Sequence, residues 1–166
     1  IHDFAFFEQL NDVCLQNNGK DIDALISEGN YKAVASNMLN ADGLNYGSLP
    51  KGLLTFHRAG DATRKAFEEH LVEGALYAAN GEGNVNLHFT VSPEHIDLFK
   101  QLASEKTALY EKRYGVKYNI SFSVQKASTD TIAAAMDNTP FRDVDGSLVF
   151  RPGGHGALIE NLNELE

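Results

Sequence analysis

The sequence VNLHFTVSPEH at residues 85–95, with GVKYNISFSV following at residues 115–124, decides the predicted fold of this chain. Each segment contains a short apolar run with the length and alternation typical of a β-strand. In the first segment, Ser92, Pro93 and Glu94 mark the start of a helix, because they supply a cap, a proline for the first turn and an acidic side chain at the positive end. The order strand, helix, strand predicts a right-handed crossover that joins two neighbouring parallel strands.

The rest of the chain extends this pattern into an α/β protein. Gly115 is placed to end the helix that lies between the two strands, which are expected at 85–91 and 116–124. The predicted fold class is α/β, with a three-layered, mostly parallel sheet and helices on both faces. The other expected helices lie at 3–17, 20–28, 31–39 and 62–79, the last with Asp61 as its N-cap, and from Gly156 onward. A strand or strand-like turn is expected at 52–57, a turn-rich excursion at 137–145 and a strand at 148–150.

Composition and charge limit the class of protein. The 166 residues, 43% of them hydrophobic and 22% charged, suit one globular domain with a buried core. The formal net charge of -9 repels phosphate backbones, so no nucleic-acid partner is expected. No apolar run of about 18 residues is present, so no membrane partner is expected either. Cys14 is the only cysteine, which excludes an internal disulfide and a cysteine zinc site, and we expect its thiol to be buried.

The domain organisation follows from the helical character of the beginning of the chain. Residues 1–45 are expected to form a helical segment that packs on the α/β domain at 46–166. Because the first residue is Ile1 rather than methionine, we expect this chain to be part of a longer protein. No charged-then-apolar leader is recognisable, and the single cysteine suits a reducing compartment, so we expect a cytoplasmic location.

The segment RPGGHG at 151–156 is the strongest candidate for a binding loop. It follows a predicted strand and opens a predicted helix, and ligands of parallel sheets bind beyond the carboxyl ends of the strands. Glycines let the backbone approach a ligand closely, so the loop amides can meet an anion or a polar ring. The alternative interpretation is a tight strand-to-helix turn that contains a histidine by chance.

Two further segments carry side chains suited to phosphate or nucleobase binding. Gln125 follows the strand that ends at Val124, and its amide can donate and accept at once, as the edge of a nucleobase requires. The polar residues after Gln125 can equally be caps of a following helix. Lys51 lies between Pro50 and Gly52, so a backbone of restricted conformation can direct its ammonium at a phosphate, although such a turn is usually only a turn.

The remaining ionisable residues do not form a recognisable catalytic pattern. No histidine pair has the spacing of a zinc protease helix. His70 and Glu73 are expected to lie on a solvated helix face. The segment 143–146 begins like a calcium loop, but the later ligand positions do not follow, so a plain turn is expected.

In order and approximate spacing, the segments LPKGLL (49–54), SFSVQ (121–125) and RPGGHGAL (151–158) resemble the UDP-sugar pyrophosphorylases. They resemble still more closely an uncharacterised bacterial domain-of-unknown-function family thought to share that sugar nucleotidyltransferase-like catalytic fold. The resemblance extends from about Gly43 to Leu162 and implies that residues 46–166 are the central, incomplete part of such a domain.

The resemblance also implies roles for individual residues. In that superfamily the lysine of the Pro-Lys motif contacts phosphate, which makes Lys51 the catalytic candidate. The glutamine after the central strand reads the uracil edge, and the glycine-rich loop holds the base and ribose. The substrate-binding residues implied in this chain are Gln125, Lys126, Gly153, Gly154, His155 and Gly156. The position of His155 is often asparagine in the better-known enzymes.

Two hallmarks of the catalytic enzymes are absent from this sequence, namely the glycine-rich phosphate loop that contains Thr-Arg and the downstream acidic metal site. We therefore expect magnesium to bind only in the parent protein and this chain alone to be inactive. The leading hypothesis is part of a protein that transfers a nucleotidyl group to a sugar 1-phosphate, with a nucleotide or sugar phosphate and the remainder of the parent chain as partners. The alternatives are a non-catalytic module that binds a nucleotide or sugar phosphate, and a structural domain whose polar loops are only turns.

Overall fold

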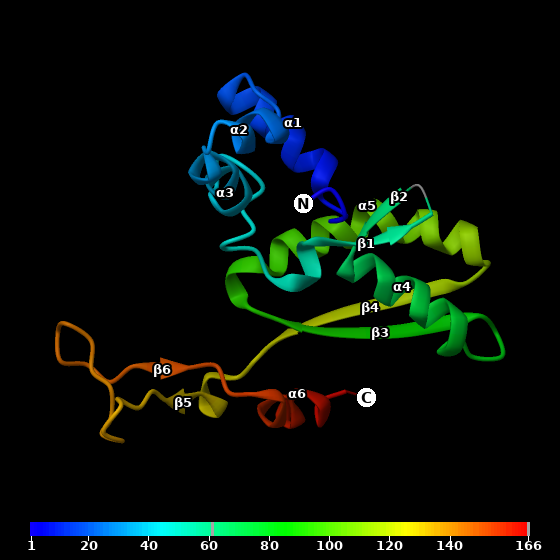
Figure 1. Cartoon of the computed structure of the whole chain (residues 1–166). Coiled ribbons are helices and arrows are strands. Elements are labelled where there is room, and N and C mark those ends of the chain that lie inside the picture. Colours follow the sequence, from blue (N-terminus) through cyan, green and yellow to red (C-terminus); the bar gives the residue numbers. More distant parts are fainter. Residues whose placement is uncertain (61, 166) are drawn as a thin grey trace.

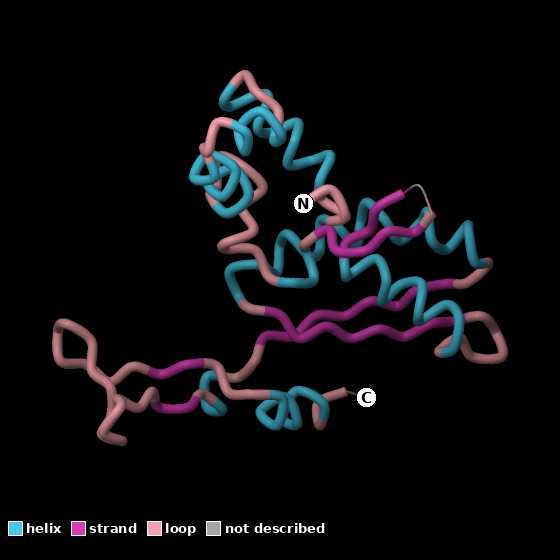
Figure 2. The backbone as a smooth tube through the Cα atoms, viewed as in Figure 1, coloured by secondary structure: helices cyan, strands magenta, loops and turns pink. Residues whose placement is uncertain are grey.

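A computed structural model describes residues 1–60 and 62–165, and it shows a mixed α/β chain (Figures 1 and 2). Its helices are α1 (Phe7–Asn18), α2 (Ile22–Ser27), α3 (Tyr31–Leu39), α4 (Ala66–Tyr77), α5 (Ile96–Tyr114) and α6 (Ile159–Leu162). Its strands are β1 (Thr55–Ala59), β2 (Ala62–Lys65), β3 (Asn84–Val91), β4 (Lys117–Val124), β5 (Thr131–Ile132) and β6 (Phe150–Arg151). Short 3-10 helices lie at η1 (Lys51–Leu53), η2 (Pro93–His95), η3 (Ala127–Thr129) and η4 (His155–Leu158).

The predicted strand-helix-strand unit is confirmed. Strand β3 pairs in parallel with β4 over eight residues, from Asn84 opposite Lys117 to Val91 opposite Val124. Helix α5 joins the two strands, and it ends where Gly115 adopts a left-handed conformation, with φ of 69°. The strand boundaries agree with those expected from the apolar runs.

The main hydrophobic core lies on the face of this strand pair that α4 and α5 cover (Figure 1). Val85 and Val91 of β3 and Tyr118 of β4 are buried there, because alternate residues of a strand point to the same face. They pack in one cluster with buried helix residues that include Phe67, Leu71, Phe99 and Leu102. The intervening polar residues of β3 and β4 belong to the opposite face. Helix α6 lies on that side of the strand pair (Figure 1).

The helix predicted at 62–79 starts later than expected. Residues Ala62–Lys65 form strand β2, which pairs antiparallel with β1, and Gly60 takes the positive φ of 66° in the turn between the two strands. The helix begins at Ala66, with Lys65 as N-cap. Pairing with β1 therefore overrides the helical pattern of these four residues. Asp61, the predicted N-cap, lies outside the described residues. The strand or strand-like turn predicted at 52–57 is confirmed in its second half, where β1 starts at Thr55, whereas its first residues belong to η1.

The described residues form three separate two-stranded ladders rather than one mostly parallel sheet. Only β3–β4 is parallel, whereas β1–β2 and β5–β6 are antiparallel. The strand predicted at 148–150 is limited to β6, with Leu148 bridged to Arg142 before it. The α/β class is thus confirmed, while the central sheet is much smaller than predicted.

The N-terminal segment has a hydrophobic cluster of its own. Phe6, Leu10, Cys14, Ile22, Leu25 and Val34 are buried together where α1, α2 and α3 meet. The thiol of Cys14 is buried, as expected, and the side-chain amide of Asn37 lies 3.4 Å from its Sγ. The backbone amide of Thr55 donates to the hydroxyl of Tyr46 at 3.2 Å, which links this segment to the start of β1.

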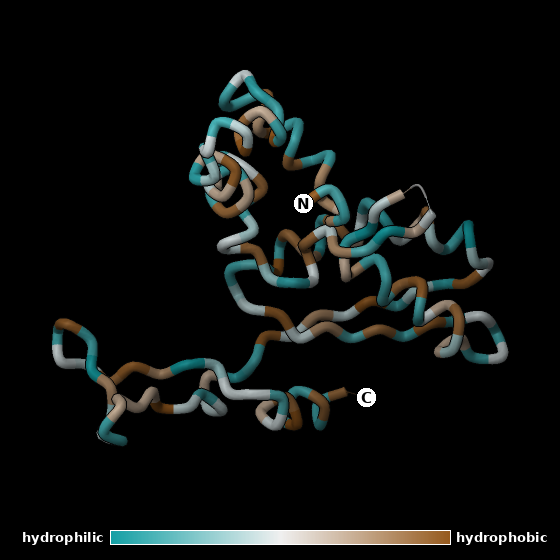
Figure 3. The backbone as a smooth tube through the Cα atoms, in the orientation of Figure 1, coloured by the Kyte–Doolittle hydropathy of each residue, from teal (hydrophilic) through white to brown (hydrophobic). Residues whose placement is uncertain are grey.

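Residues 131–151 form an arm that extends away from the rest of the chain (Figure 1). The arm is held by β5–β6 and by two isolated bridges, and it contains the expected turn-rich excursion. Hydrophobic segments appear along it in Figure 3, and the side chains of Met136, Val144 and Phe150 are exposed. Among the described residues, no helix combines the length and apolar character needed to cross a bilayer.

Candidate functional site

The candidate site lies where β4 ends. Gln125 directly follows β4, and its Nε2 donates to Thr129 Oγ1 at 3.2 Å. The Thr129 hydroxyl in turn donates to the carbonyl of Lys126 at 2.7 Å, which closes the short η3 turn. A Cβ atom added at Gly153 would lie 3.5 Å from Gln125 Nε2. The structure therefore brings the predicted glutamine and the predicted glycine loop together, although they are far apart in sequence.

The glycines of the loop differ in what the fold requires of them. A Cβ at Gly153 would lie 2.7 Å from the carbonyl oxygen of Thr129 and 2.9 Å from the Cβ of Ala157, so close packing requires glycine at this position. A Cβ at Gly154 or Gly156 would meet nothing within 4 Å. The φ of Gly154 is -72°, which any residue can adopt. The turn interpretation thus explains Gly153, whereas packing within the chain gives no reason for the other two glycines.

The backbone amides of the loop are open to a ligand. Residues 153–156 precede and begin η4, where the first amides of a helix have no acceptor within the helix. Among residues 1–60 and 62–165, no acceptor pairs with these four amides. Gly154, His155 and Gly156 are exposed and Gly153 is half-buried, so the loop is accessible from the surface.

Lys126 does not project freely from the loop. Its ammonium pairs with Oε1 of Glu164, and that hydrogen bond raises the pKa of the lysine above its ordinary value. A ligand phosphate would have to compete with this carboxylate for the predicted substrate-binding residue.

Lys51 occupies an exposed position in η1. A Cβ at the neighbouring Gly52 would lie 2.7 Å from Cε1 of Phe99, so the turn packs closely on the first part of α5. Because α5 starts just beyond the end of β3, η1 lies at the same end of the strand pair as Gln125 (Figure 1). Within the described part of the chain, no hydrogen bond or ion pair joins Lys51 to Gln125 or to the glycine loop. The structure brings two of the three predicted motifs together, whereas the third, Lys51, lies at the same end of the strand pair without a hydrogen bond or ion pair to them among the described residues.

The polar face of the strand pair was not identified as a site from the sequence. The imidazole of His88 lies between two hydroxyls, with Nδ1 2.8 Å from Ser121 Oγ and Nε2 2.8 Å from Ser123 Oγ. Asn161 of α6 is only 2% exposed, and its Nδ2 donates to Ser123 Oγ at 3.0 Å, while its Oδ1 has no partner among the described residues. A groove of about 640 Å³ lies between this face and Leu165. The strict polar alternation of the two strands was the sequence signal for this surface.

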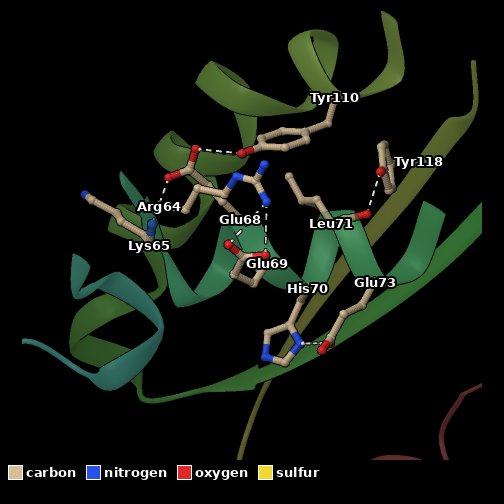
Figure 4. A network of polar contacts seen from close by, with 9 residues as sticks. All are labelled: Arg64, Lys65, Glu68, Glu69, His70, Leu71, Glu73, Tyr110 and Tyr118. Atoms are coloured by element: carbon tan, nitrogen blue, oxygen red, sulfur yellow. Dashed lines mark hydrogen bonds and ion pairs between the residues drawn. The ribbon is translucent and has the colours of Figure 1, made fainter. Parts of the chain in front are cut away.

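A cluster of ionisable groups also joins α4 to α5 (Figure 4). Glu68 is 5% exposed, and its carboxylate accepts from the hydroxyl of Tyr110 at 3.1 Å and from the backbone amide of Lys65 at 3.0 Å. Lys106 lies 3.3 Å from the same carboxylate. Burial, followed by the charge of Glu68, raises the pKa of Tyr110 to about 12. These contacts connect the helices and leave no free acid or base, so we interpret the cluster as structural.

The remaining ionisable candidates agree with their structural interpretations. His70 and Glu73 form an exposed pair on α4 at 3.1 Å (Figure 4). Asp145 accepts from the amide and hydroxyl of Ser147 at 2.9 and 2.7 Å, in a turn where Gly146 has a φ of 84°. In the part of the chain that the structure describes, no three His, Cys, Asp or Glu residues are grouped as metal ligands would be.

These features define an α/β domain with a polar loop cluster at the carboxyl end of a parallel strand pair. The whole chain, residues 1–166, matches the family described as a domain of unknown function (DUF4301), and the chain belongs to that family. No curated protein and no solved structure matches it. The similarity to UDP-sugar pyrophosphorylases therefore depends on the three sequence segments and stays a prediction.

Proposed function

We propose that this domain binds a nucleotide or sugar phosphate between Gln125 and the loop at 153–156. The observation that carries the proposal is the proximity of Gln125 to Gly153, at the edge of the strand pair where ligands of parallel strands bind. The exposed amides of the loop suit phosphate or ribose oxygens, and the glutamine amide suits the edge of a base. Gly154 and Gly156, which the packing of the chain does not require, leave space for a ligand close to the backbone.

The reaction class we propose for the protein that contains this domain is nucleotidyl transfer to a sugar 1-phosphate, with release of pyrophosphate. In that arrangement Lys51 would stabilise phosphate oxygens as a point charge, and catalysis would come mainly from positioning and electrostatics. Magnesium would neutralise phosphate charge in that reaction, and its ligands would have to come from the remainder of the parent protein, because the described residues group no three His, Cys, Asp or Glu side chains as metal ligands. The proposed three-layered nucleotidyltransferase-like architecture requires more strands than β3 and β4 alone.

Ligand binding without turnover is the second candidate function. The ion pair between Lys126 and Glu164 makes the ammonium less available to the phosphate of any ligand, so it does not decide between the two functions. Release of pyrophosphate from a nucleoside triphosphate and a sugar 1-phosphate would distinguish the two functions. The binding proposal holds in both cases.

Thermal unfolding with candidate ligands tests the binding proposal on this chain. UTP, ATP, UDP-glucose, glucose 1-phosphate and inorganic phosphate would each be added with and without magnesium. A ligand at 100 times its dissociation constant stabilises the native state by about 2.7 kcal/mol. We expect this stabilisation to be lost in Gln125→Ala and in Gly154→Val.

Gln101→Ala is the matched control, because Gln101 is an exposed glutamine on α5 that hydrogen-bonds only to the nearby Glu105. It should leave ligand stabilisation unchanged. If none of the five compounds stabilises the chain, or if the control variant loses as much stabilisation as Gln125→Ala, the proposed site is wrong.

A further inference from the structure

The outer edge of β3 is an open row of backbone hydrogen-bonding groups. The amide of Lys117 donates to the carbonyl of Gly83 at 2.9 Å, which fixes the alternation of the parallel ladder. With this pattern, the odd-numbered residues of β3 bond to β4. The backbone N–H and C=O groups of Asn86, His88 and Thr90 point away from β4. Among the described residues, nothing pairs with these six groups.

The outer edge of β4 is engaged at both of its ends, while the backbone groups of Ile120 and Phe122 between them also have no partner among the described residues. At one end, the amide of Tyr118 donates to Glu111 Oε1 at 3.1 Å. At the other end, the carbonyl of Val124 accepts from Asn161 Nδ2 at 2.9 Å. The β3 edge has only its first residue engaged, where the carbonyl of Asn84 accepts from the amide of Asn80 at 2.9 Å.

The sequence of β3 lacks the residues that usually prevent an edge strand from pairing with a further strand. Its eight residues, NVNLHFTV, include neither a charged residue nor a proline, although edge strands of soluble proteins usually carry one or the other. Strand β3 thus resembles an inner strand of a larger parallel sheet, because it is paired on one edge and carries uncharged, unpaired backbone groups on the other.

A groove runs beside the same edge, beneath α4. It has a volume of about 240 Å³ and is lined by His70, Glu73 and Tyr77 of α4 and by Leu87 and Phe89 of β3. The side chain of Tyr77 is 77% exposed there. An added strand would direct alternate side chains into this groove, where apolar groups would contact Leu87 and Phe89. Its other side chains would lie beside the polar face of β3.

We propose that the β3 edge accepts one extended polypeptide segment, contributed by polypeptide outside residues 1–166, with apolar side chains on its α4 side and polar side chains on the other. Pairing of β3 with β3 of a second copy is disfavoured by sterics. Paired strands lie about 4.8 Å apart, whereas packed helices need about 8–10 Å. In a symmetric antiparallel β3–β3 pair, each copy would bring its own α4 over the same face. His70, Glu73 and Tyr77 of α4 line the groove beside β3, so the two helices would compete for the same space. The occupant is therefore a strand without a helix on that face.

Peptide titration of the isotope-labelled chain, followed by NMR, tests this inference. The probe is an acetylated and amidated octapeptide, Lys-Thr-Val-Thr-Ile-Thr-Val-Lys, added up to millimolar concentration. Its control has the same composition in the order Lys-Thr-Thr-Thr-Val-Ile-Val-Lys, which breaks the alternation without changing the charge. We expect saturable shifts of the amides of Asn86, His88 and Thr90, and binding at least about tenfold weaker for the control, a difference of about 1.4 kcal/mol.

Two variants identify the surface. Asn86→Pro removes one outward N–H while leaving the β3–β4 ladder intact, and it should abolish the shifts. Tyr77→Ser should weaken binding without affecting the fold, and Leu76→Ser is its matched control, because Leu76 is 70% exposed on α4 but does not line the groove. If Asn86→Pro does not fold, comparison of the peptide affinities of Tyr77→Ser and Leu76→Ser still tests the inference.

Four outcomes would overturn the inference. Equal binding of the two peptides would show that alternation is not recognised, and shifts centred on Ile120 and Phe122 would assign pairing to the β4 edge. Self-association that Asn86→Pro abolishes would assign the edge to a second copy. Absence of any shift at Asn86, His88 and Thr90 would likewise exclude a strand acceptor.

Discussion

Replacing Gly153 and Gly154 separately by alanine distinguishes a glycine that packing requires from one that it does not. A methyl group at Gly153 would lie 2.7 Å from the Thr129 carbonyl oxygen, well inside the 3.5–4.0 Å of a normal contact. Overpacking of this kind costs about 1–3 kcal/mol. Alanine at Gly154 meets nothing within 4 Å and suits the φ of -72°, so it should stabilise by about 0.4–1 kcal/mol through the unfolded chain. We expect the free energies of unfolding of the two variants to differ by about 1.4–4 kcal/mol, with Gly153→Ala the less stable.

Urea unfolding followed by far-UV circular dichroism measures the difference, since the chain has no tryptophan to report it by fluorescence. The side-chain amide of Gln125 provides a local readout, because the new methyl at Gly153 would lie 3.5 Å from its Nε2. That NMR signal should move in Gly153→Ala and stay in place in Gly154→Ala. Equal free energies of unfolding within about 0.5 kcal/mol, together with an unmoved Gln125 signal in both variants, would refute the close approach of loop and glutamine.

Two other substitutions test the packing around the site. The wild-type chain should lose stability at alkaline pH, where Tyr110 ionises, and Tyr110→Phe should not show this loss. The folded-state pKa of Tyr110 is raised from 10.0 to about 12, so the contribution is present below pH 10 and lost as the pH rises toward 12. The wild-type advantage in free energy of unfolding should shrink by about 2–3 kcal/mol across that interval, and a constant difference from pH 9 to pH 12 would contradict it. Gly52→Ala should destabilise by about 1–3 kcal/mol, because its methyl would lie 2.7 Å from the buried ring of Phe99. Lys51→Ala is the neighbouring control, expected to change stability by less than about 0.5 kcal/mol, and an equal loss in both variants would show that η1 does not pack on α5 as described.

The elements that sequence patterns predicted correctly are those whose signals are local. The strand pair, α5 and the stop at Gly115 follow from apolar alternation, a helix start and a left-handed helix end, all of which lie within the segments themselves. The error at residues 62–65 has the opposite origin. These residues have no strong strand signal, and they become β2 only because β1 is beside them, so a non-local pairing overrides the helical pattern.

The candidate site shows the same division. The position of Gln125 beyond the end of β4 was predictable from the order of elements. The glycine loop instead follows β6, which pairs antiparallel with β5 in a separate ladder, so its approach to Gln125 does not follow from the rule for parallel sheets. The sequence could not show that packing requires glycine at Gly153 but not at Gly154 or Gly156. The crowding at Gly153 comes from the carbonyl oxygen of Thr129, which is distant in sequence. Pairing of Lys126 with Glu164 depends on the path of the last residues after α6, which no local pattern specifies. The hydroxyl cradle around His88 required knowledge of the register between the two strands.

The ligand site and the strand acceptor lie on different parts of the strand pair, so they succeed or fail independently. Gln125 follows the last residue of β4, whereas Asn86, His88 and Thr90 present their backbone groups at the outer edge of β3. A strand added at that edge would contact neither Gln125 nor the amides at 153–156. It would instead extend the row of strand ends at which Gln125 lies, because a parallel neighbour of β3 would finish at the same edge of the sheet. Loops that follow such a strand would then face the glycine loop across the ends of β3 and β4. The unpaired edge thus identifies the direction from which further ligand-contacting groups would come.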